Sequence, residues 1–392
     1  MNSPESLQSE FGQFQRWALA IGIAALGVCV AGAFRAPTQF FRSYLLAFVF
    51  WIGIPLGCSA ILMLHHLVGG TWGFAIRRFL ESGARTTWLM AVLMIPILFG
   101  LRVLYSWADP GKASLDPVLA HKQFYLNVPF FIGRTVVYFV AWLAIAHFLV
   151  KWSLEQDQTA EADLTKRLQT LSGPGLLIYG LTVTYASVDW VMSLEPHWFS
   201  TIYSMIFMVT QGLSAMAFVT ILAMLLADRK PLSRILSPLV MNDLGNLLLT
   251  FTMLWAYLSF SQYLIIWAGN LQDEIPWYVS RASGGWTWIA LILIVFHFAV
   301  PFFLLLMRFV KRRRRLLAAV AVELIVMSLI DMFWLTVPAY ERSGPQFQWM
   351  DWLATVGIGG IWLWLFLSQL RSQPLVPLHD PRLELGGVAH HG

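Results

Sequence analysis

The side chains most able to do chemistry in this sequence are ionisable groups that stand inside long apolar stretches. His297, Glu323 and Asp331 are of this kind, and Asp189 follows a run of hydroxyl residues that includes Tyr185. An ionisable group in hydrocarbon is costly, so it usually faces the protein interior or a hydrated path. Carboxyl, imidazole and hydroxyl groups in such a path can pass protons through bridging water. These five residues therefore form a candidate proton path, and polar bonding between packed helices is the alternative role.

The spacing of two of these carboxyl residues favours a common position inside the protein. Glu323 and Asp331 are eight residues apart. In an α-helix this spacing separates two side chains by about 80° around the axis. Both carboxyl groups can therefore face the same neighbouring helices.

Residues that could hold a redox centre are scarce. Cys29 and Cys58 are the only cysteines, and both stand in apolar stretches. They supply no disulfide framework, no covalent haem motif and no ligand set for an iron–sulfur cluster or structural zinc. A b-type haem needs two histidines at similar depth on facing helices. His65, His66 and His147 are expected near one membrane surface, where they would be solvated, whereas His297 is expected near the middle of its span, so no such pair is predicted. We expect no catalytic residue, cofactor or metal in this chain.

Composition indicates the environment in which the candidate path lies. The chain has 392 residues, of which 58% are hydrophobic and 12% charged, and its mean hydropathy is +0.66. Soluble globular proteins carry about 25% charged residues, so this is an integral membrane protein. A membrane-spanning helix needs about 20 apolar residues, and ten runs of sufficient length predict an all-α protein with ten transmembrane helices. The runs are 17–34, 43–68, 86–107, 127–150, 173–193, 199–227, 240–268, 286–308, 316–337 and 350–370.

The distribution of basic residues predicts the orientation. With an even number of spans both chain ends lie on one side, and 18 of the 26 basic residues fall on that side. The positive-inside rule therefore places both ends in the cytoplasm. Because the basic residues follow membrane topology, nucleic acid is not an expected partner. The 18 residues are Arg16, Arg77, Arg78, Arg85, Lys151, Lys166, Arg167, Arg229, Lys230, Arg234, Arg308, Lys311, Arg312, Arg313, Arg314, Arg315, Arg371 and Arg382.

The predicted organisation has three parts. Residues 1–16 form a cytoplasmic N-terminal segment, 17–371 the ten-helix transmembrane domain, and 372–392 a polar, irregular cytoplasmic tail. The first apolar run ends in an Ala-Gly-Ala sequence that is similar to a signal-peptide cleavage site. We expect this run to be retained as a helix, because the segment before it carries Glu5 and Glu10.

Other polar positions lead to further expectations. Spans 5 and 7 carry many hydroxyl and amide residues, which predicts that both are interior helices. Arg102 and Arg134 are expected to extend toward the outer surface. The connection 151–172 mixes acids and bases and is expected to be a solvated amphipathic helix. The basic run from Arg308 to Arg315 is expected at the cytoplasmic surface.

Two segments carry a specific resemblance. They are Ser187 to Tyr203, with the sequence SVDWVMSLEPHWFSTIY, and Ser261 to Trp277, with the sequence SQYLIIWAGNLQDEIPW. Both resemble the ActF-type membrane subunit of bacterial alternative complex III, which belongs to the larger NrfD-like group of polysulfide reductase membrane subunits. Supporting similarity lies in Leu64 to Gly73 (LHHLVGGTWG) and in the HFAVPF sequence that begins at His297.

The resemblance implies a particular architecture and assembly. In that family helices 2–5 and 6–9 form two four-helix bundles, and helices 1 and 10 flank them. The complex lies in the bacterial inner membrane and oxidises quinol. Its electrons pass to partner subunits that carry haem c and iron–sulfur clusters, and a sister NrfD-like subunit binds the quinol. The expected role is a structural and proton-conducting subunit without a redox centre of its own, in contact with those partners and with membrane lipids.

Two other functions stay open at the level of sequence. One is that the chain itself oxidises quinol, with a carboxylate or imidazole taking the proton. The other is a stand-alone secondary transporter, which would favour broken helices at matching positions in two halves. Span 7 is continuous, and Pro301 in span 8 has only Pro129 as a counterpart, which weighs against the transporter.

Overall fold

The computed structural model describes residues 4–159, 161–377 and 380. Within these residues the secondary structure is helical, without any β-strand. Ten helical stretches are long and apolar enough to cross a membrane, which confirms the predicted number and the all-α class. They are Gly12–Ala33, Pro37–Val68, Thr71–Phe99, Val128–Thr159, Asp163–Leu194, Tyr203–Leu225, Pro238–Gly269, Trp286–Leu306, Arg314–Ala339 and Trp349–Arg371.

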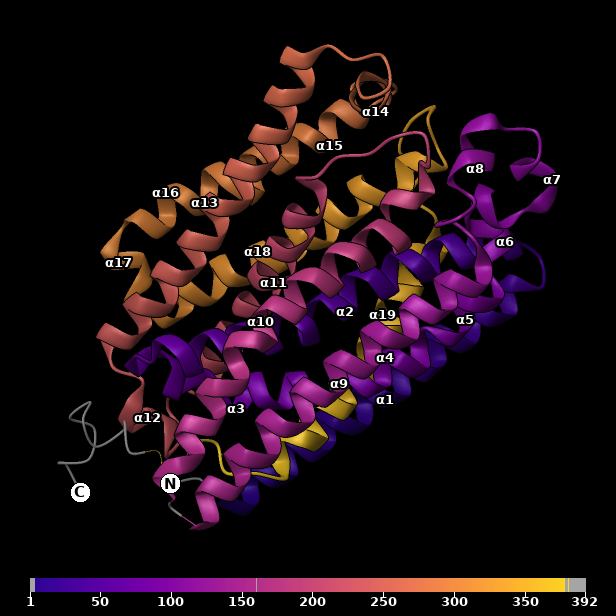
Figure 1. Cartoon of the computed structure of the whole chain (residues 1–392). Helices are drawn as coiled ribbons and strands as arrows, with labels where there is room; N and C mark the ends of the chain where they lie inside the picture. The colour runs from indigo at the N-terminus through magenta and orange to yellow at the C-terminus, as the bar shows by residue number, and fades with distance from the viewer. Residues whose placement is uncertain (1–3, 160, 378–379, 381–392) are drawn as a thin grey trace.

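The spanning stretches are built from long helices, two of them assembled from shorter pieces (Figure 1). The long elements are α1 (Pro4–Ala33), α2 (Pro37–Val68), α3 (Thr71–Arg85) with α4 (Thr87–Leu93) and α5 (Ile95–Phe99), α9 (Val128–Thr159), α10 (Ala162–Trp190), α11 (Tyr203–Leu225), α13 (Pro238–Gly269), α15 (Trp286–Ile292) with the π-helix η3 (Leu293–Ala299) and α16 (Val300–Leu306), α18 (Arg314–Thr336) and α19 (Trp349–Arg371). The connecting elements are α6 (Leu101–Leu104), η1 (Ser106–Ala108), α7 (Pro110–Ala113), α8 (Pro117–Lys122), η2 (Met192–Leu194), α12 (Leu232–Ile235), α14 (Ile275–Arg281), α17 (Arg308–Lys311) and η4 (Val337–Ala339).

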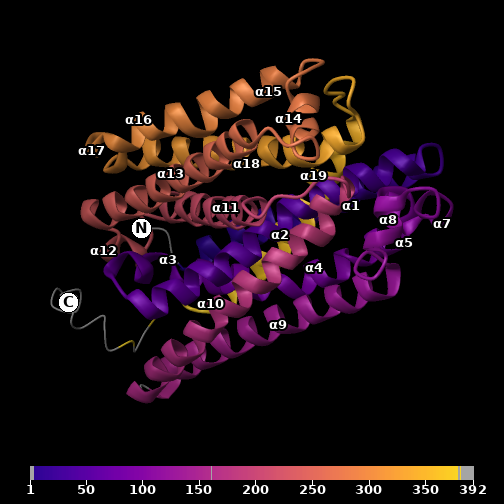
Figure 2. The same ribbon diagram turned by 45° about the horizontal axis from the view of Figure 1, so that its top comes forward.

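The helices define two ends of the molecule (Figures 1 and 2). α1 begins and α19 ends at one of them, which we call the terminal face. The other end carries α7, α8 and α14, and we call it the opposite face. α1 begins at Pro4, so the part of the predicted N-terminal segment 1–16 that is described belongs to this helix.

Local sequence signals explain where the long helices begin and end. α13 starts after Ser237, whose hydroxyl accepts a hydrogen bond from the backbone N–H of Val240, and has Pro238 in its first turn. Both choices suit a helix N-terminus, because Ser satisfies an unpaired N–H and Pro has none to satisfy. α13 ends at Gly269 and is followed by Asn270, which adopts a left-handed conformation with φ 49°. These signals fix a single unbroken span.

α2 and α11 occupy the interior. α11 contacts α2, α18, α13 and α10, and α2 also contacts α3, α10 and α19. In the most apolar window of each helix, 89% of the residues of α2 and 78% of those of α11 are buried, against 44% for α10 and 28% for α13. The prediction that spans 5 and 7 are interior helices is therefore wrong for most of their length.

The hydroxyl residues of α10 and α13 explain this error. The hydroxyl of Thr184 donates to the carbonyl of Gly180 at 2.7 Å, and that of Thr250 donates to the carbonyl of Asn246 at 2.9 Å. Such a hydroxyl is satisfied by its own helix and needs no neighbouring helix. A high density of Ser and Thr therefore does not require burial against protein.

Span 3 begins earlier than its sequence suggests. The prediction placed it at 86–107, whereas the observed span runs from Thr71 to Phe99. Its first half, α3, carries Arg77, Arg78 and Glu81, and these charges made the segment look like a solvated connection. In the structure all three side chains are buried.

The connection between spans 4 and 5 also differs from the prediction. It was expected to form a separate amphipathic helix over 151–172. Instead α9 continues to Thr159 and α10 begins at Ala162, so the two spanning helices extend beyond the apolar runs and pack against each other. The mixed charges of this region lie on the ends of the two long helices.

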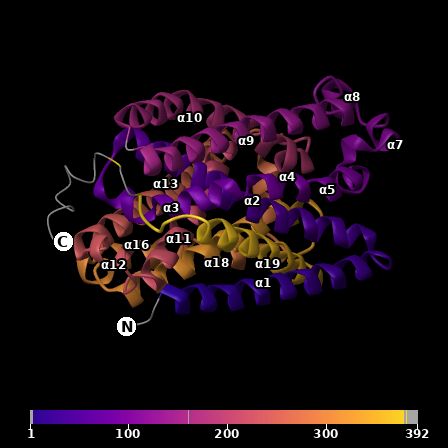
Figure 3. The same ribbon diagram turned by 90° about the horizontal axis from the view of Figure 1, so that it is seen from below.

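α1 lies beside α19 over much of its length (Figure 3). Small residues permit the contact: a Cβ added to Gly22 would stand 2.8 Å from the backbone nitrogen of Ile361 and 3.0 Å from the carbonyl oxygen of Gly357. Close approach of backbones through small residues is the usual way in which helices associate in a membrane. α1 and α19 are therefore one packed pair.

Candidate functional site

The carboxyl group of Asp331 lies where three helices meet. Asp331 belongs to α18 and is 2% exposed. Its Oδ2 accepts hydrogen bonds from Oγ1 of Thr210 in α11 and from Nε1 of Trp255 in α13, each at 3.1 Å. Both donors are neutral, so a charged carboxylate here would have no counterion in these contacts.

The imidazole of His297 stacks on the same tryptophan. The ring centroids of His297 and Trp255 are 4.2 Å apart, and their planes differ by 25°. His297 lies in the π-helix η3 and has no exposed surface. In the described part of the chain neither ring nitrogen has a hydrogen-bond partner. π-Helical turns within membrane or soluble helices are frequent at functional sites, because they re-aim a side chain.

Trp255 thus connects the two central ionisable residues of the predicted path. One side of its indole contacts the His297 ring, and its N–H contacts Asp331. We call these three residues with Thr210 the central cluster. It brings η3, α13, α18 and α11 together at one point.

The other three residues of the predicted path lie elsewhere. Glu323 is partly exposed on α18, two turns from Asp331 toward the terminal face. Tyr185 is 49% exposed on the outside of α10. Asp189, at the end of α10, is buried against α9.

Asp189 forms a paired site with α9. Its two carboxylate oxygens accept hydrogen bonds from Nε and Nη2 of Arg134 at 2.9 and 2.8 Å, and Tyr138 donates to the same carboxylate at 2.7 Å. The ring of Tyr125 lies 3.8 Å from the Arg134 guanidinium carbon. The prediction that Arg134 extends toward the surface is therefore wrong, because a bidentate carboxylate holds it inward.

A second buried ion pair was not foreseen from the sequence. Arg281 is 2% exposed and donates to Glu195 at 2.8 Å and to the carbonyl oxygens of Trp277, Trp334 and Leu335. Its guanidinium lies 3.7 Å from the centre of the Trp277 ring. Glu195 and Trp277 come from the two segments that carry the family resemblance, so these segments meet in space. The sequences Glu195-Pro196 and Glu274-Ile275-Pro276 place an acidic residue before a proline in each segment, but they do not indicate which residue pairs with Glu195.

A third charged group lies under the terminal face, and we call it the α3 charge cluster. Arg77 donates to Glu81 at 2.9 Å and to Asp380 at 2.6 Å, and Arg78 donates to Glu81 and Asp157. Arg77, Arg78 and Glu81 have no exposed surface. Arg77 and Arg78 were counted among the basic residues on the side of the chain ends, and in the structure each is paired with carboxylates inside the protein.

The beginning of the predicted irregular tail takes part in this cluster. The amide nitrogen of Gln373 donates to the hydroxyl of Ser82 at 2.6 Å, and Asp380 is 2% exposed. The remainder of that predicted tail, 378–379 and 381–392, lies outside the described residues. Gln373, Val376, Pro377 and Asp380 are thus buried, whereas Ser372 and Pro374 are exposed.

Two further expectations about basic residues need correction. His65 and His66 were expected to be solvated at a membrane surface, but neither has exposed surface, and the His65 ring contacts the rings of Trp72 and Phe74. Lys311, in the predicted basic surface run, is 6% exposed and donates to Asn246 at 2.6 Å. Arg312 to Arg315 are exposed, as expected for that run.

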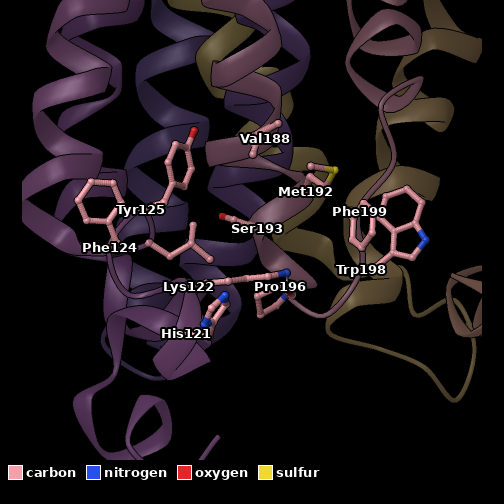
Figure 4. A pocket seen from close by; sticks show the side chains of 11 residues that line it. His121, Lys122, Phe124, Tyr125, Val188, Met192, Ser193, Pro196, Trp198 and Phe199 are labelled. Atoms are coloured by element: carbon pink, nitrogen blue, oxygen red, sulfur yellow. Dashed lines mark hydrogen bonds between the residues drawn. The ribbon is translucent and has the colours of Figure 1, made fainter. Parts of the chain in front are cut away.

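A pocket opens near the opposite face (Figure 4). Its volume is about 450 Å³. It lies between α8 with the segment that joins it to α9, and the end of α10 with η2 and the loop that follows. It is lined by His121, Lys122, Phe124, Tyr125, Leu126, Val188, Met192, Ser193, Pro196, Trp198 and Phe199.

The described residues contain no group of three or more His, Cys, Asp or Glu side chains placed to hold a metal ion. Cys29 and Cys58 are both buried and unpaired with each other. The imidazole and carboxyl groups of the central cluster can form hydrogen bonds and exchange protons.

Comparison with protein-family models and with curated proteins finds no match to this chain. The likeness to the ActF-type subunit therefore depends on the two segments themselves.

Proposed function

We propose that this chain is an integral subunit of a quinol-oxidising respiratory complex of the alternative complex III type, in the bacterial inner membrane with both ends in the cytoplasm. Its partners carry haem c and iron–sulfur clusters, and a sister subunit binds the quinol. Ten spanning helices support the proposal, as does the contact of Trp198 with Trp277, which joins the two segments that resemble the family.

We also propose that spans 2–5 (α2 to α10) and spans 6–9 (α11 to α18) form two four-helix bundles. The contacts that support this are those of α9 with α10 and α3, and of α2 with α3 and α10, on one side. On the other side α11 contacts α13 and α18, and η3 contacts α18 and α13. The central pair α2 and α11 would join the two groups, and α1 with α19 would flank them.

The observation that carries a proton-conducting role is the central cluster. A buried carboxyl group that has only neutral hydrogen-bond donors has a lower free energy when protonated than when charged, and it can release its proton when a hydrated path opens. A neutral imidazole with two unbonded nitrogens can accept and pass that proton. Asp331 accepts a hydrogen bond from the N–H of Trp255, and His297 stacks on the ring of the same tryptophan.

Replacement of the carboxyl group in the assembled complex tests this role. Asp331→Asn keeps the shape and the Trp255 contact but removes the exchangeable proton. We expect fewer protons moved per electron, with the complex still assembled. Asp351→Asn is the matched control, because Asp351 is also buried and accepts a hydrogen bond from a hydroxyl, that of Ser43 at 2.5 Å, but lies at the opposite face.

Glu323→Gln examines the rest of the path on the same helix. A drop in proton translocation in both Glu323→Gln and Asp331→Asn would extend the path toward the terminal face. Unchanged translocation with normal quinol oxidation in both variants would leave the cluster a packing role only.

Purification in mild detergent tests membership of a complex. Co-elution with subunits that contain haem c and iron–sulfur clusters is the expected result. A stable isolated monomer would favour a transporter, and quinol oxidation by the isolated chain with an added acceptor would favour the catalytic alternative.

A further inference from the structure

The pocket near the opposite face has a mainly apolar interior. Leu126, Val188, Met192 and Trp198 contribute to its walls. Its volume of about 450 Å³ falls within the roughly 300–1,000 Å³ of ordinary ligand pockets. Its position at the helix ends, beside aromatic side chains, corresponds to the level at which Trp and Tyr usually meet lipid headgroups.

Lys122 supplies a positive charge at this pocket. Its Nζ donates to the carbonyl oxygen of Pro196 at 2.6 Å and lies 5.9 Å from the centre of the Phe199 ring. An ammonium has three donors, so two are not used by the Pro196 bond. In the parts of the chain that the structure covers, Lys122 forms no salt bridge. The ammonium is thus held at the pocket by a neutral acceptor.

The charged groups around Lys122 leave it available to an anion. Burial lowers the pKa of Lys122, and the more distant Asp273 raises it by a smaller amount. Asp116 is occupied by His197, whose Nε2 lies 2.7 Å from the carboxylate. His121, next to Lys122, is exposed and also lines the pocket. A partly desolvated ammonium beside an apolar cavity is a site for an anion that carries an apolar chain.

We propose that this pocket binds an anionic glycerophospholipid, with an acyl chain against the apolar walls and its phosphate at Lys122. The cavity is apolar and its edge carries a positive charge, so the two halves of such a lipid each find a matching surface. A free anion would interact with Lys122 alone, and a lipid without net charge would interact mainly with the apolar walls. Phosphatidylglycerol is therefore the probe expected to bind better than phosphatidylcholine.

Retention of defined lipids by the purified full chain tests the site. The protein is exchanged into micelles that contain equal amounts of phosphatidylglycerol and phosphatidylcholine, and bound lipid is measured by native mass spectrometry. We expect preferential retention of one phosphatidylglycerol. Lys122→Gln should lower that preference by about five-fold, the factor expected for one basic side chain at a lipid headgroup.

Two further variants separate the site from general effects. Lys112→Gln is the matched control, because Lys112 is an exposed lysine on the neighbouring α7 and does not line the pocket. It should keep the preference. Val188→Trp should fill the apolar cavity and lower retention of both lipids while the protein stays monodisperse.

Three results would overturn the proposal. The first is equal retention of the two lipids by the unmodified chain. The second is displacement of phosphatidylglycerol by glycerol phosphate at equal concentration, because that would identify a simple phosphate site. The third is retention of an added quinone in preference to either lipid.

Discussion

The indole rings of Trp198 and Trp277 stack with their centroids 4.6 Å apart and their planes 13° apart. Trp198 belongs to the segment that follows α10, and Trp277 to α14 after α13. The guanidinium of Arg281 covers the Trp277 ring and reaches Glu195 on the first segment. These aromatic and ionic contacts therefore hold the segment after α10 against α14 at the opposite face.

Truncation of this stack should destabilise the protein. Trp277→Ala removes a ring that is 3% exposed and leaves Arg281 without its cover, so we expect a loss of about 3–5 kcal/mol. The measurement is reversible unfolding in mixed micelles. Trp288→Ala is the control, because Trp288 is 70% exposed, and its stability should stay near that of the unmodified chain. Similar losses in both variants would contradict the packing role of the stack.

The pair of Arg134 and Asp189 should behave as a buried ion pair. Asp189→Asn leaves a guanidinium without its carboxylate and should cost about 3–5 kcal/mol in unfolding free energy. The double variant Arg134→Met with Asp189→Leu should regain much of that loss, because neither charge is then left alone. If Asp189→Asn is as stable as the unmodified chain, the bidentate contact does not hold α9 to α10.

The contact between Gly245 and Lys311 predicts a steric effect. A Cβ at position 245 would lie 2.5 Å from Cγ of Lys311, so Gly245→Ala should destabilise by about 1–3 kcal/mol. Gly133→Ala is the control, because a Cβ there meets nothing within 4 Å. It should be neutral or slightly stabilising, since Ala favours helix more than Gly does. A thermal unfolding series of the two variants gives the comparison.

Accessibility to a membrane-impermeant thiol reagent tests the proposed orientation. Arg313→Cys places a thiol on the terminal face, and Leu115→Cys places one on the opposite face, where Leu115 is 86% exposed. In intact spheroplasts only the second should react, and both should react after lysis. The native cysteines give little background because Cys29 and Cys58 have no exposed surface. The reverse pattern would invert the topology.

The number of spans was predictable because apolar length alone determines it. The start of span 3 was not predictable, because Arg77 and Glu81 are charged residues that a sequence alone places in water. Their pairing, which makes burial possible, is seen only in the structure. The division between interior and outer helices was not predictable either. In a membrane both lipid-facing and protein-facing positions are apolar, and a Thr on either can bond its own helix.

The central cluster shows which part of a site a sequence reveals. His297 and Asp331 were identifiable because an ionisable group in an apolar run is rare. Trp255 was not, because it is one of 19 tryptophans and its neighbours give no sign of its two contacts. Arg134 was misplaced for a related reason, since its carboxylate partner lies 55 residues away. Pairing across helices depends on packing angles that a single sequence does not provide.

The bond between Arg77 and Asp380 joins residues that are 303 positions apart. A ribosome that has made α3 and α9 has supplied Glu81 and Asp157, but the third carboxylate of the α3 charge cluster is still to be synthesised. Until it arrives, Arg77 has one fewer acidic partner than in the finished protein. Insertion of the early helices can therefore precede the last ion pair of α3. A chain interrupted after α19 would lack Asp380 and leave Arg77 with Glu81 as its acidic partner.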